Sequence, residues 1–236
     1  MVDSIYFVSL GPGDPELITV KGLRRLQQSD VIFCPATRTQ GGAVYSRSAD
    51  IVRALQIDAE KIKTFVLPMR KERSETWKVY DQLAEDAARL YAEGLKVAIV
   101  AEGDAGFYTS IQYIYSKFEA KQIPVRRIAG IPAFIAAGAT GGLHIVKQEE
   151  RLVVIPGNAE PDELMRYLKD NYTIVIMKLS ACIEAVHQCI DRCPEADFHY
   201  FENIGTENEY YTSDPVRIRQ TKFPYFSLII IQKHGL

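Results

Sequence analysis

The sequence has no apolar run that approaches the roughly 18 residues needed to cross a bilayer. Its first residues, MVDSIYFVSLGPGD, also lack the basic region and the cleavage site of a secretory signal peptide. Both absences argue against a membrane protein or a secreted one. We therefore expect a cytoplasmic protein that does not bind membranes.

An excess of positive charge is missing as well. The formal net charge is −2, from 28 Lys and Arg against 30 Asp and Glu. Proteins that bind nucleic acids through the phosphates depend on clustered Lys and Arg. The charge balance therefore argues against nucleic acid as a partner, whereas local charges can still bind a small acidic ligand.

Cysteine is scarce, and three of the four cysteines, Cys182, Cys189 and Cys193, fall in one short stretch with His187. Such clustering is one indication of a metal site. However, the segment SACIEAVHQCI has the apolar spacing of an amphipathic helix, and zinc sites usually contain a C-x-x-C pair. Since free cysteine behaves as a small hydrophobic residue, we favour buried or free thiols and predict no metal.

The composition, with 47% hydrophobic and 25% charged residues, is that of a globular protein. Short apolar runs rich in β-branched and aromatic residues alternate with longer amphipathic stretches, which is typical of βα units around a largely parallel sheet. This pattern predicts a helix over 132–139 and restarts after the polar segment HIVKQEER. We therefore predict an α/β protein with two α/β domains, residues 1–146 and 147–236, the second with partly antiparallel strands.

Three loops each follow a predicted strand and precede a predicted helix: GPGDP at 11–15, EGDAGFYTS at 102–110 and AGIPA at 129–133. The first lacks the third glycine of a dinucleotide fingerprint and the lysine of a phosphate loop. Because loops at the carboxyl ends of parallel strands converge on one crevice, the first two can line the same site. The second can equally be an ordinary turn, and the third a well-formed helix start.

Taken in order, these loops resemble those of the tetrapyrrole methylase family, which includes methyltransferases of the cobalamin and siroheme pathways. The segments VSLGPGDPELITVKGLRRLQQSDVIF, EGDAGFYTSIQYIY, AGIPAFIAAGATGGLHI, ENIGTENE and PYFSLIII carry the resemblance over essentially the whole chain. Ala105 and Ala129 stand where prolines are common in the family. FVLPM at 65–69, the helix with Trp77 and VIMKLS at 175–180 look most like the precorrin-2 or cobalt-factor II C20-methyltransferases.

The resemblance implies two domains of the tetrapyrrole methylase type, unlike a Rossmann-like methyltransferase, with the active site in the cleft between them. It implies S-adenosyl-L-methionine as cofactor, methylation of carbon 20 of precorrin-2 or cobalt-factor II in cobalamin biosynthesis, and a homodimer. Carried over position by position, the cofactor-binding residues are Leu10, Pro12, Glu102, Gly103, Asp104, Phe107, Pro132, Ala133, Met177, Ile204, Gly205 and Phe226.

Methyl transfer from a sulfonium mainly requires alignment of the two reactants, so we assign no catalytic residue from the sequence. Glu102, Asp104 and Tyr108 are candidates for a base that accepts the proton released from the methylated carbon. A substrate with many carboxylates also calls for cations around it. The substrate-binding candidates are Arg38, Arg47 and Arg70.

Other functions stay open at this point. Within the family, the chain could methylate another corrin carbon, act as a siroheme-type uroporphyrinogen methylase, or methylate diphthamide. A nucleotide-dependent oxidoreductase is disfavoured by the missing third glycine and by the lack of an acidic residue after the second predicted strand. A non-catalytic protein that binds the cofactor or a pigment is the remaining alternative.

Overall fold

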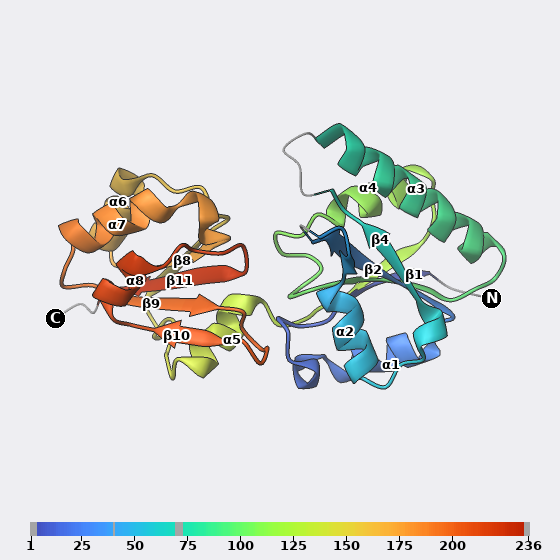
Figure 1. The fold of residues 1–236 in the computed structure, drawn as a ribbon, viewed down its shortest axis with the longest axis horizontal. Coiled ribbons are helices and arrows are strands. Elements are labelled where there is room, and N and C mark those ends of the chain that lie inside the picture. Colours follow the sequence, from blue (N-terminus) through green and yellow to red (C-terminus); the bar gives the residue numbers. More distant parts are fainter. Residues whose placement is uncertain (1–3, 40, 69–72, 234–236) are drawn as a thin grey trace. The chain divides into compact units, whose positions relative to one another are not determined.

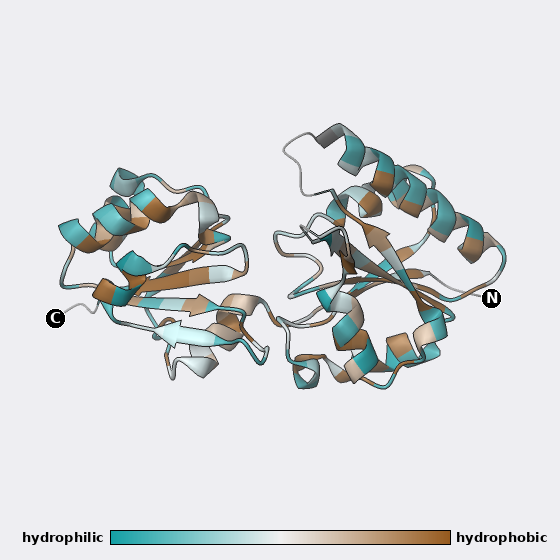
Figure 2. Ribbon diagram, in the orientation of Figure 1, coloured by the Kyte–Doolittle hydropathy of each residue, from teal (hydrophilic) through white to brown (hydrophobic). Residues whose placement is uncertain are grey.

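The computed structural model describes residues 4–39, 41–68 and 73–233. The chain divides into two compact units, residues 1–132 and 133–236, and each has its own sheet and its own core (Figure 1). In both units the apolar residues gather on the strands and on the helix faces turned toward them (Figure 2).

The first unit is built on a six-stranded sheet. Five strands run parallel in the order β4-β2-β5-β1-β6, and β3 pairs antiparallel with the end of β2. The central strands β1 and β5 are buried along their whole length, as expected for parallel strands covered on both faces. The strands are β1 (Ile5–Ser9), β2 (Val31–Arg38), β3 (Val44–Tyr45), β4 (Ile62–Val66), β5 (Val97–Ala101) and β6 (Val125–Ile128).

Helices cover both faces of this sheet (Figure 1). Successive residues of a strand point to opposite faces, so Phe7 packs with Tyr80 and Phe118 of the α3 and α4 layer, whereas Val8 packs with Leu26 of α1. The helices are α1 (Val20–Gln28), α2 (Arg47–Ala54), α3 (Arg73–Ala92) and α4 (Gln112–Ala120), with short 3₁₀ turns at Pro15–Leu17 and Ala59–Lys61.

The second unit has a mixed five-stranded sheet in the order β10-β9-β11-β8-β7. β7 and β8 are parallel, whereas β11 is antiparallel to both β8 and β9, and β10 is antiparallel to β9. The predicted partly antiparallel pairing is therefore confirmed. The strands are β7 (Arg151–Ile155), β8 (Tyr172–Met177), β9 (Asp197–Glu202), β10 (Tyr210–Thr212) and β11 (Ser227–Gln232).

The helices of the second unit are α5 (Ala133–Thr140), α6 (Pro161–Lys169), α7 (Ile183–Arg192) and α8 (Pro215–Gln220), with a 3₁₀ turn at Leu179–Ala181. Cys182, Cys189 and Cys193, within and at the two ends of α7, are buried free thiols in the core of the second unit, as predicted. Burial raises the pKa of the Cys189 thiol to about 12. Across both units, none of the helices formed by the described residues combines the length and the apolar character of a membrane span.

The division between the units falls at 132/133, whereas the sequence places the domain boundary at 146/147. The difference is the segment of α5 and the turn after it. A Cβ at Gly141 would lie 2.9 Å from Cζ of Phe201 in β9, so this segment packs directly on the second sheet. Gln232 Nε2 also donates to the backbone oxygens of His144 (2.9 Å) and Ile145 (3.0 Å). Contacts with residues far along the chain therefore join residues 133–146 to the second unit.

Candidate active site

The first two glycine loops meet at the carboxyl edge of the first sheet. The Gly11 N–H donates to the Gly103 oxygen (3.2 Å) and the Gly103 N–H to the Gly11 oxygen (2.7 Å), which forms an isolated antiparallel bridge. Both residues have positive φ, 79° and 69°, a conformation that glycine adopts without a steric penalty. The loops after β1 and β5 are thus adjacent, in agreement with the parallel strand order.

Asp104 connects the second loop to the third. Its Oδ1 accepts from the Gly106 N–H and its Oδ2 from the Gly130 N–H, both at 2.7 Å. The sequence suggested Asp104 as a cofactor-binding residue and a candidate base, but it could not show these two backbone bonds. Because each carboxylate oxygen has more than one acceptor position, Asp104 can hold both loops and still accept from a ligand.

Ser9, the last residue of β1, links the second loop to the end of β6, where the third loop begins. Its buried hydroxyl donates to the Ile128 oxygen (2.6 Å) and accepts from the Ala105 N–H (2.8 Å). A Cβ at Gly130 would lie 2.3 Å from Cβ of Ser9, so only glycine fits there. Sequence reasoning missed Ser9, although a small hydroxyl at the end of an otherwise apolar strand was a usable signal.

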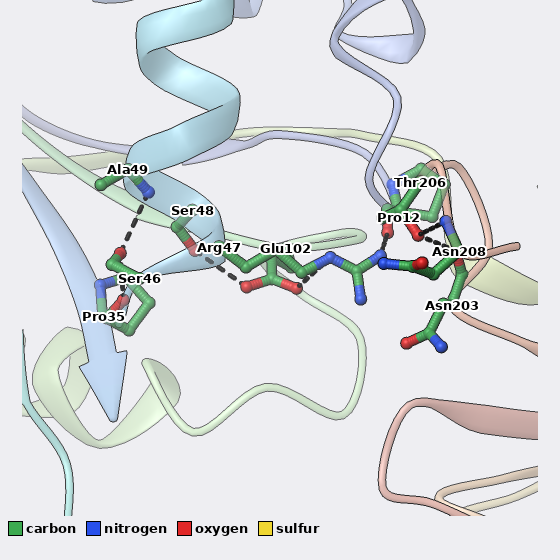
Figure 3. A network of polar contacts seen from close by, with 10 residues as sticks. All are labelled: Pro12, Pro35, Ser46, Arg47, Ser48, Ala49, Glu102, Asn203, Thr206 and Asn208. Carbon is green, nitrogen blue, oxygen red and sulfur yellow. Dashed lines mark hydrogen bonds and ion pairs between the residues drawn. The ribbon is translucent and has the colours of Figure 1, made fainter. Parts of the chain in front are cut away.

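A second group of polar contacts links α2 to the first two loops (Figure 3). Arg47 Nη2 donates to the Pro12 oxygen (2.7 Å), and its Nε lies 3.5 Å from Oε2 of Glu102. The Ser48 hydroxyl donates to the other Glu102 oxygen (3.1 Å). The side chains of Arg47 and Glu102 are only 10% and 25% exposed. Arg47 therefore binds partners within the protein, whereas the sequence suggested a cation directed at the substrate.

The carboxyl of Glu102 has a shifted pKa in this network. Burial raises the pKa of Glu102, and the nearby Arg47 charge and the Ser48 hydrogen bond lower it by less. A carboxyl with a raised pKa holds a proton more readily near neutral pH than an exposed one. Glu102 is therefore better suited to accept a proton than an ordinary surface carboxylate.

The remaining residues predicted in the first unit are spread along this edge. The Leu10 side chain is fully buried in the core, so only its backbone can face a ligand. The rings of Phe107 and Tyr108 pack against each other at a tilt, with centroids 4.5 Å apart, and Tyr108 is exposed with a φ of 49°. Pro132 and Ala133 are the last two residues of the third loop; Pro132 ends the first unit, and Ala133 begins α5, one residue after the predicted helix start.

The other two predicted cations differ in position. Arg38, at the end of β2, is exposed, and its Nη1 donates to the Gly42 oxygen (3.2 Å) of the turn between β2 and β3. Arg70 lies outside the described residues. Of the three candidates, the structure therefore describes Arg38 and Arg47, and it places Arg47 in an internal network.

In the second unit, four predicted residues lie at one edge of the sheet. β8 ends at Met177, which pairs with Leu228 of β11. The N–H of Asn203, directly after β9, donates to the Phe226 oxygen (2.9 Å), directly before β11. This edge therefore holds Met177, Ile204, Gly205 and Phe226, of which Ile204 is buried and Phe226 is exposed. A Cβ at Gly157 would lie 2.7 Å from the Met177 oxygen, so the loop after β7 also approaches this edge.

Known proteins resemble the chain over nearly its whole length. The family of tetrapyrrole (corrin/porphyrin) methylases matches residues 4–217. The chain is 30% identical over 234 residues to a precorrin-2 C(20)-methyltransferase of Sinorhizobium sp, covering 95% of this chain and 93% of that protein. It is 26% identical over 178 residues to a probable cobalt-precorrin-2 C(20)-methyltransferase of Methanocaldococcus jannaschii, covering 75% and 73%.

A solved structure shows the same fold. Uroporphyrin-III C-methyl transferase from Thermus thermophilus, complexed with S-adenosylhomocysteine, matches with a TM-score of 0.68 at 17% identity and covers 97% of both chains. Together with the two sheets described above, this likeness confirms the predicted fold class of two α/β domains.

Proposed function

The chain belongs to the tetrapyrrole (corrin/porphyrin) methylase family, and we propose on this basis that it transfers a methyl group from S-adenosylmethionine to carbon 20 of precorrin-2 or cobalt-factor II. It is accordingly an S-adenosylmethionine-dependent C-methyltransferase of cobalamin biosynthesis. The observation that carries the specific assignment is the 30% identity to a precorrin-2 C(20)-methyltransferase across 95% of the chain.

The carboxyl edge of the first sheet suits the proposed cofactor site. A Cβ added at Gly103 would meet no atom within 4 Å, so the backbone faces open space where the first two loops meet. A ligand can approach such a backbone closely and form hydrogen bonds with it. The proposed cofactor contacts of the first unit are Leu10, Pro12, Glu102, Gly103, Asp104, Phe107 and Pro132. Those of the second are Ala133, Met177, Ile204, Gly205 and Phe226.

When bound, S-adenosylmethionine supplies a methyl group that is already activated on a sulfonium. The protein therefore has to place the reacting carbon in line with that methyl, and such positioning alone can contribute about 7 to 11 kcal/mol. The backbone bridge, Asp104 and Ser9 make the three loops one rigid support for this placement. For the proton that leaves the methylated carbon, we propose Glu102 as the acceptor, because burial raises its pKa.

The experiment that tests this function is incubation of the purified protein with S-adenosylmethionine and, in parallel, precorrin-2 and cobalt-factor II. The expected result is a mass gain of one methyl group, located at carbon 20 by ¹³C NMR. The substrate that reacts also decides whether the ring arrives without metal or with cobalt. A methyl at another carbon, or no transfer to either substrate, would contradict the proposal.

A siroheme-type uroporphyrinogen methylase is the main alternative within the family. The similarity to the Thermus thermophilus enzyme is 17% in sequence and supports only a shared fold. Uroporphyrinogen III should therefore be a poor substrate in the same assay. We also propose, from the family resemblance, a homodimer in the cytoplasm, and sedimentation equilibrium of the purified protein tests the dimer.

A further inference from the structure

The cations predicted from the sequence leave the recognition of substrate carboxylates largely unexplained, because Arg47 binds Pro12 and Glu102 inside the protein. Arg127 is in a different situation. It lies near the end of β6, where it pairs in register with Phe7 of β1, and its side chain is exposed. It shares the face of the sheet that α4 covers, because Phe7 packs there.

An aromatic platform holds the Arg127 side chain. Its guanidinium carbon lies 4.8 Å from the centroid of the Tyr115 ring. The Tyr115 ring packs in turn on Phe7 at 5.5 Å, and Phe7 is fully buried and packs on Phe118. A guanidinium over an aromatic face is attracted by the ring quadrupole, so this stack limits the conformations of a long side chain. Less conformational entropy is then lost when a ligand binds.

The same side chain lies against the second glycine loop. A Cβ at Gly106 would lie 2.8 Å from Nη1 of Arg127 and 3.2 Å from its Cδ. Gly106 is also the residue whose N–H donates to Asp104, which binds the third loop. The guanidinium therefore lies at the carboxyl edge of the first sheet, beside the loop proposed to contact the cofactor.

Within the part of the chain that the structure describes, no carboxylate forms an ion pair with Arg127, whose guanidinium lies over the Tyr115 ring and beside Gly106. By comparison, Arg47, Arg53 and Arg89 all pair with carboxylates. A guanidinium presents a planar set of donors that matches a carboxylate in a two-point geometry. Stacking on a ring occupies the face of this group and leaves the donors on its edge available.

We propose that Arg127 binds a peripheral carboxylate of the tetrapyrrole and orients the ring beside the second loop. This assignment rests on the proposed function, because it requires a substrate with carboxylates. Arg127 is then a substrate-binding residue that sets the position of the ring and takes no part in the transfer of the methyl group.

The neighbouring Arg126 offers a matched control, since it carries the same charge on the same strand but points to the opposite face of the sheet. The experiment compares Arg127→Gln and Arg126→Gln in steady-state kinetics with precorrin-2 or cobalt-factor II, whichever the wild-type enzyme methylates. Loss of a charge-assisted contact should raise the KM for the tetrapyrrole about tenfold or more in Arg127→Gln. Its kcat should stay within about twofold, and Arg126→Gln should match the wild type in both constants.

Calorimetric titration with S-adenosylhomocysteine separates substrate recognition from damage to the loop, because its Kd should be unchanged in both variants. Arg127→Lys should give an intermediate KM, since it keeps the charge and loses the planar set of donors. If Arg127→Gln lost S-adenosylhomocysteine binding, Tyr115→Leu, which removes the platform and keeps the cation, should still raise the KM.

Equal KM values for Arg127→Gln and Arg126→Gln, with a wild-type enzyme that methylates carbon 20, would overturn the assignment and leave the proposed function intact. A wild-type protein that methylates neither substrate would overturn the proposed function and this assignment with it.

Discussion

The two units shape the edges of their sheets in different ways. In the first unit, side chains tie together loops that are far apart in sequence: Asp104 binds the third loop, Ser9 binds the second, and Arg47 binds the first. In the second unit, the edge depends on backbone conformation, with left-handed φ values of 60° at Lys178 and 49° at Asn203. A direct backbone bond from Asn203 to Phe226 joins two of its strands.

Strand topology explains this difference. Parallel strands are connected by crossovers that pass over the sheet, so neighbouring loops at one edge begin as independent segments. Side chains must then link them. Antiparallel strands such as β9 and β11 carry their backbone pairing to the very edge of the sheet. We therefore expect single substitutions to affect several loops at once in the first unit and to remain local in the second.

The largest effect is expected for Gly130→Ala. Its new Cβ would lie 2.3 Å from Cβ of Ser9 and 2.7 Å from the Gly103 oxygen, so the second and third loops must separate. Overpacking and the weakened bond to Asp104 should together lower the free energy of unfolding by about 3 kcal/mol. Urea unfolding measures this loss, and binding of S-adenosylhomocysteine should weaken in parallel.

Gly142→Ala is the matched control in the second unit. Gly142 has a φ of 65°, but a Cβ there would meet no atom within 4 Å. Only the left-handed backbone penalty of about 1 kcal/mol should appear, and binding should be unaffected. Equal losses in the two variants would show that the close contact at Gly130 does not matter.

Asp104→Ala should have the next largest effect. It removes the acceptor of two backbone N–H groups, those of Gly106 and Gly130, and should lower the free energy of unfolding by about 2 kcal/mol. Asp14→Ala is the control: among the residues that the structure describes, the Asp14 side chain accepts from Glu16 in its own turn alone, so its loss should cost about 1 kcal/mol or less. Thermal unfolding of the two variants measures the difference, and a smaller loss at Asp104 than at Asp14 would refute the link between the loops.

A smaller, pH-dependent effect is expected for Glu102. Its pKa is raised in the folded protein above the ordinary value of 4.5, so the folded state binds the proton more tightly than the unfolded chain. This group therefore stabilises the protein most below that pH, and its contribution declines as the pH rises through the folded pKa.

Two variants test this effect in urea titrations at increasing pH. Glu102→Gln should gain stability relative to the wild type as the pH rises above 4.5. Arg47→Gln should show a steeper decline than the wild type, because it removes the charge that lowers the Glu102 pKa. A difference between the wild type and Glu102→Gln that did not change with pH would show that the pKa of Glu102 is not raised by folding.

The smallest effect is expected in the second unit, for Lys178→Gly. Relief of the left-handed conformation at a φ of 60° opposes the greater flexibility of an unfolded chain with glycine, so the net change should be a gain below about 1 kcal/mol. Lys169→Gly, at the last residue of α6, should instead destabilise by up to about 1 kcal/mol. Chemical unfolding of both variants should therefore give changes of opposite sign, and a clear loss in Lys178→Gly would count against strain at this turn.

Much of the fold was predictable because its signals are local. Apolar runs identify the strands, and glycine loops directly after them identify the carboxyl edge of the first sheet. The roles of the arginines were not predictable in this way. Arg47 is bound by Pro12, 35 residues away in sequence, whereas Arg127 rests on the Tyr115 ring of another element. No local pattern distinguishes a cation held inside a network from one that is free to bind a ligand.

The sequence by itself determined the fold class, the order of the loops and the family, because each depends on the spacing of residues within short segments. Only the tertiary structure decided that Asp104 holds two loops and that residues 133–146 belong to the second unit. It also decided that Arg127, which was not among the candidates from the sequence, lies beside the second loop at the carboxyl edge of the first sheet. These features arise from contacts such as those of Gly130 with Ser9 and of Gly141 with Phe201. Such contacts exist only once distant segments of the chain have packed together.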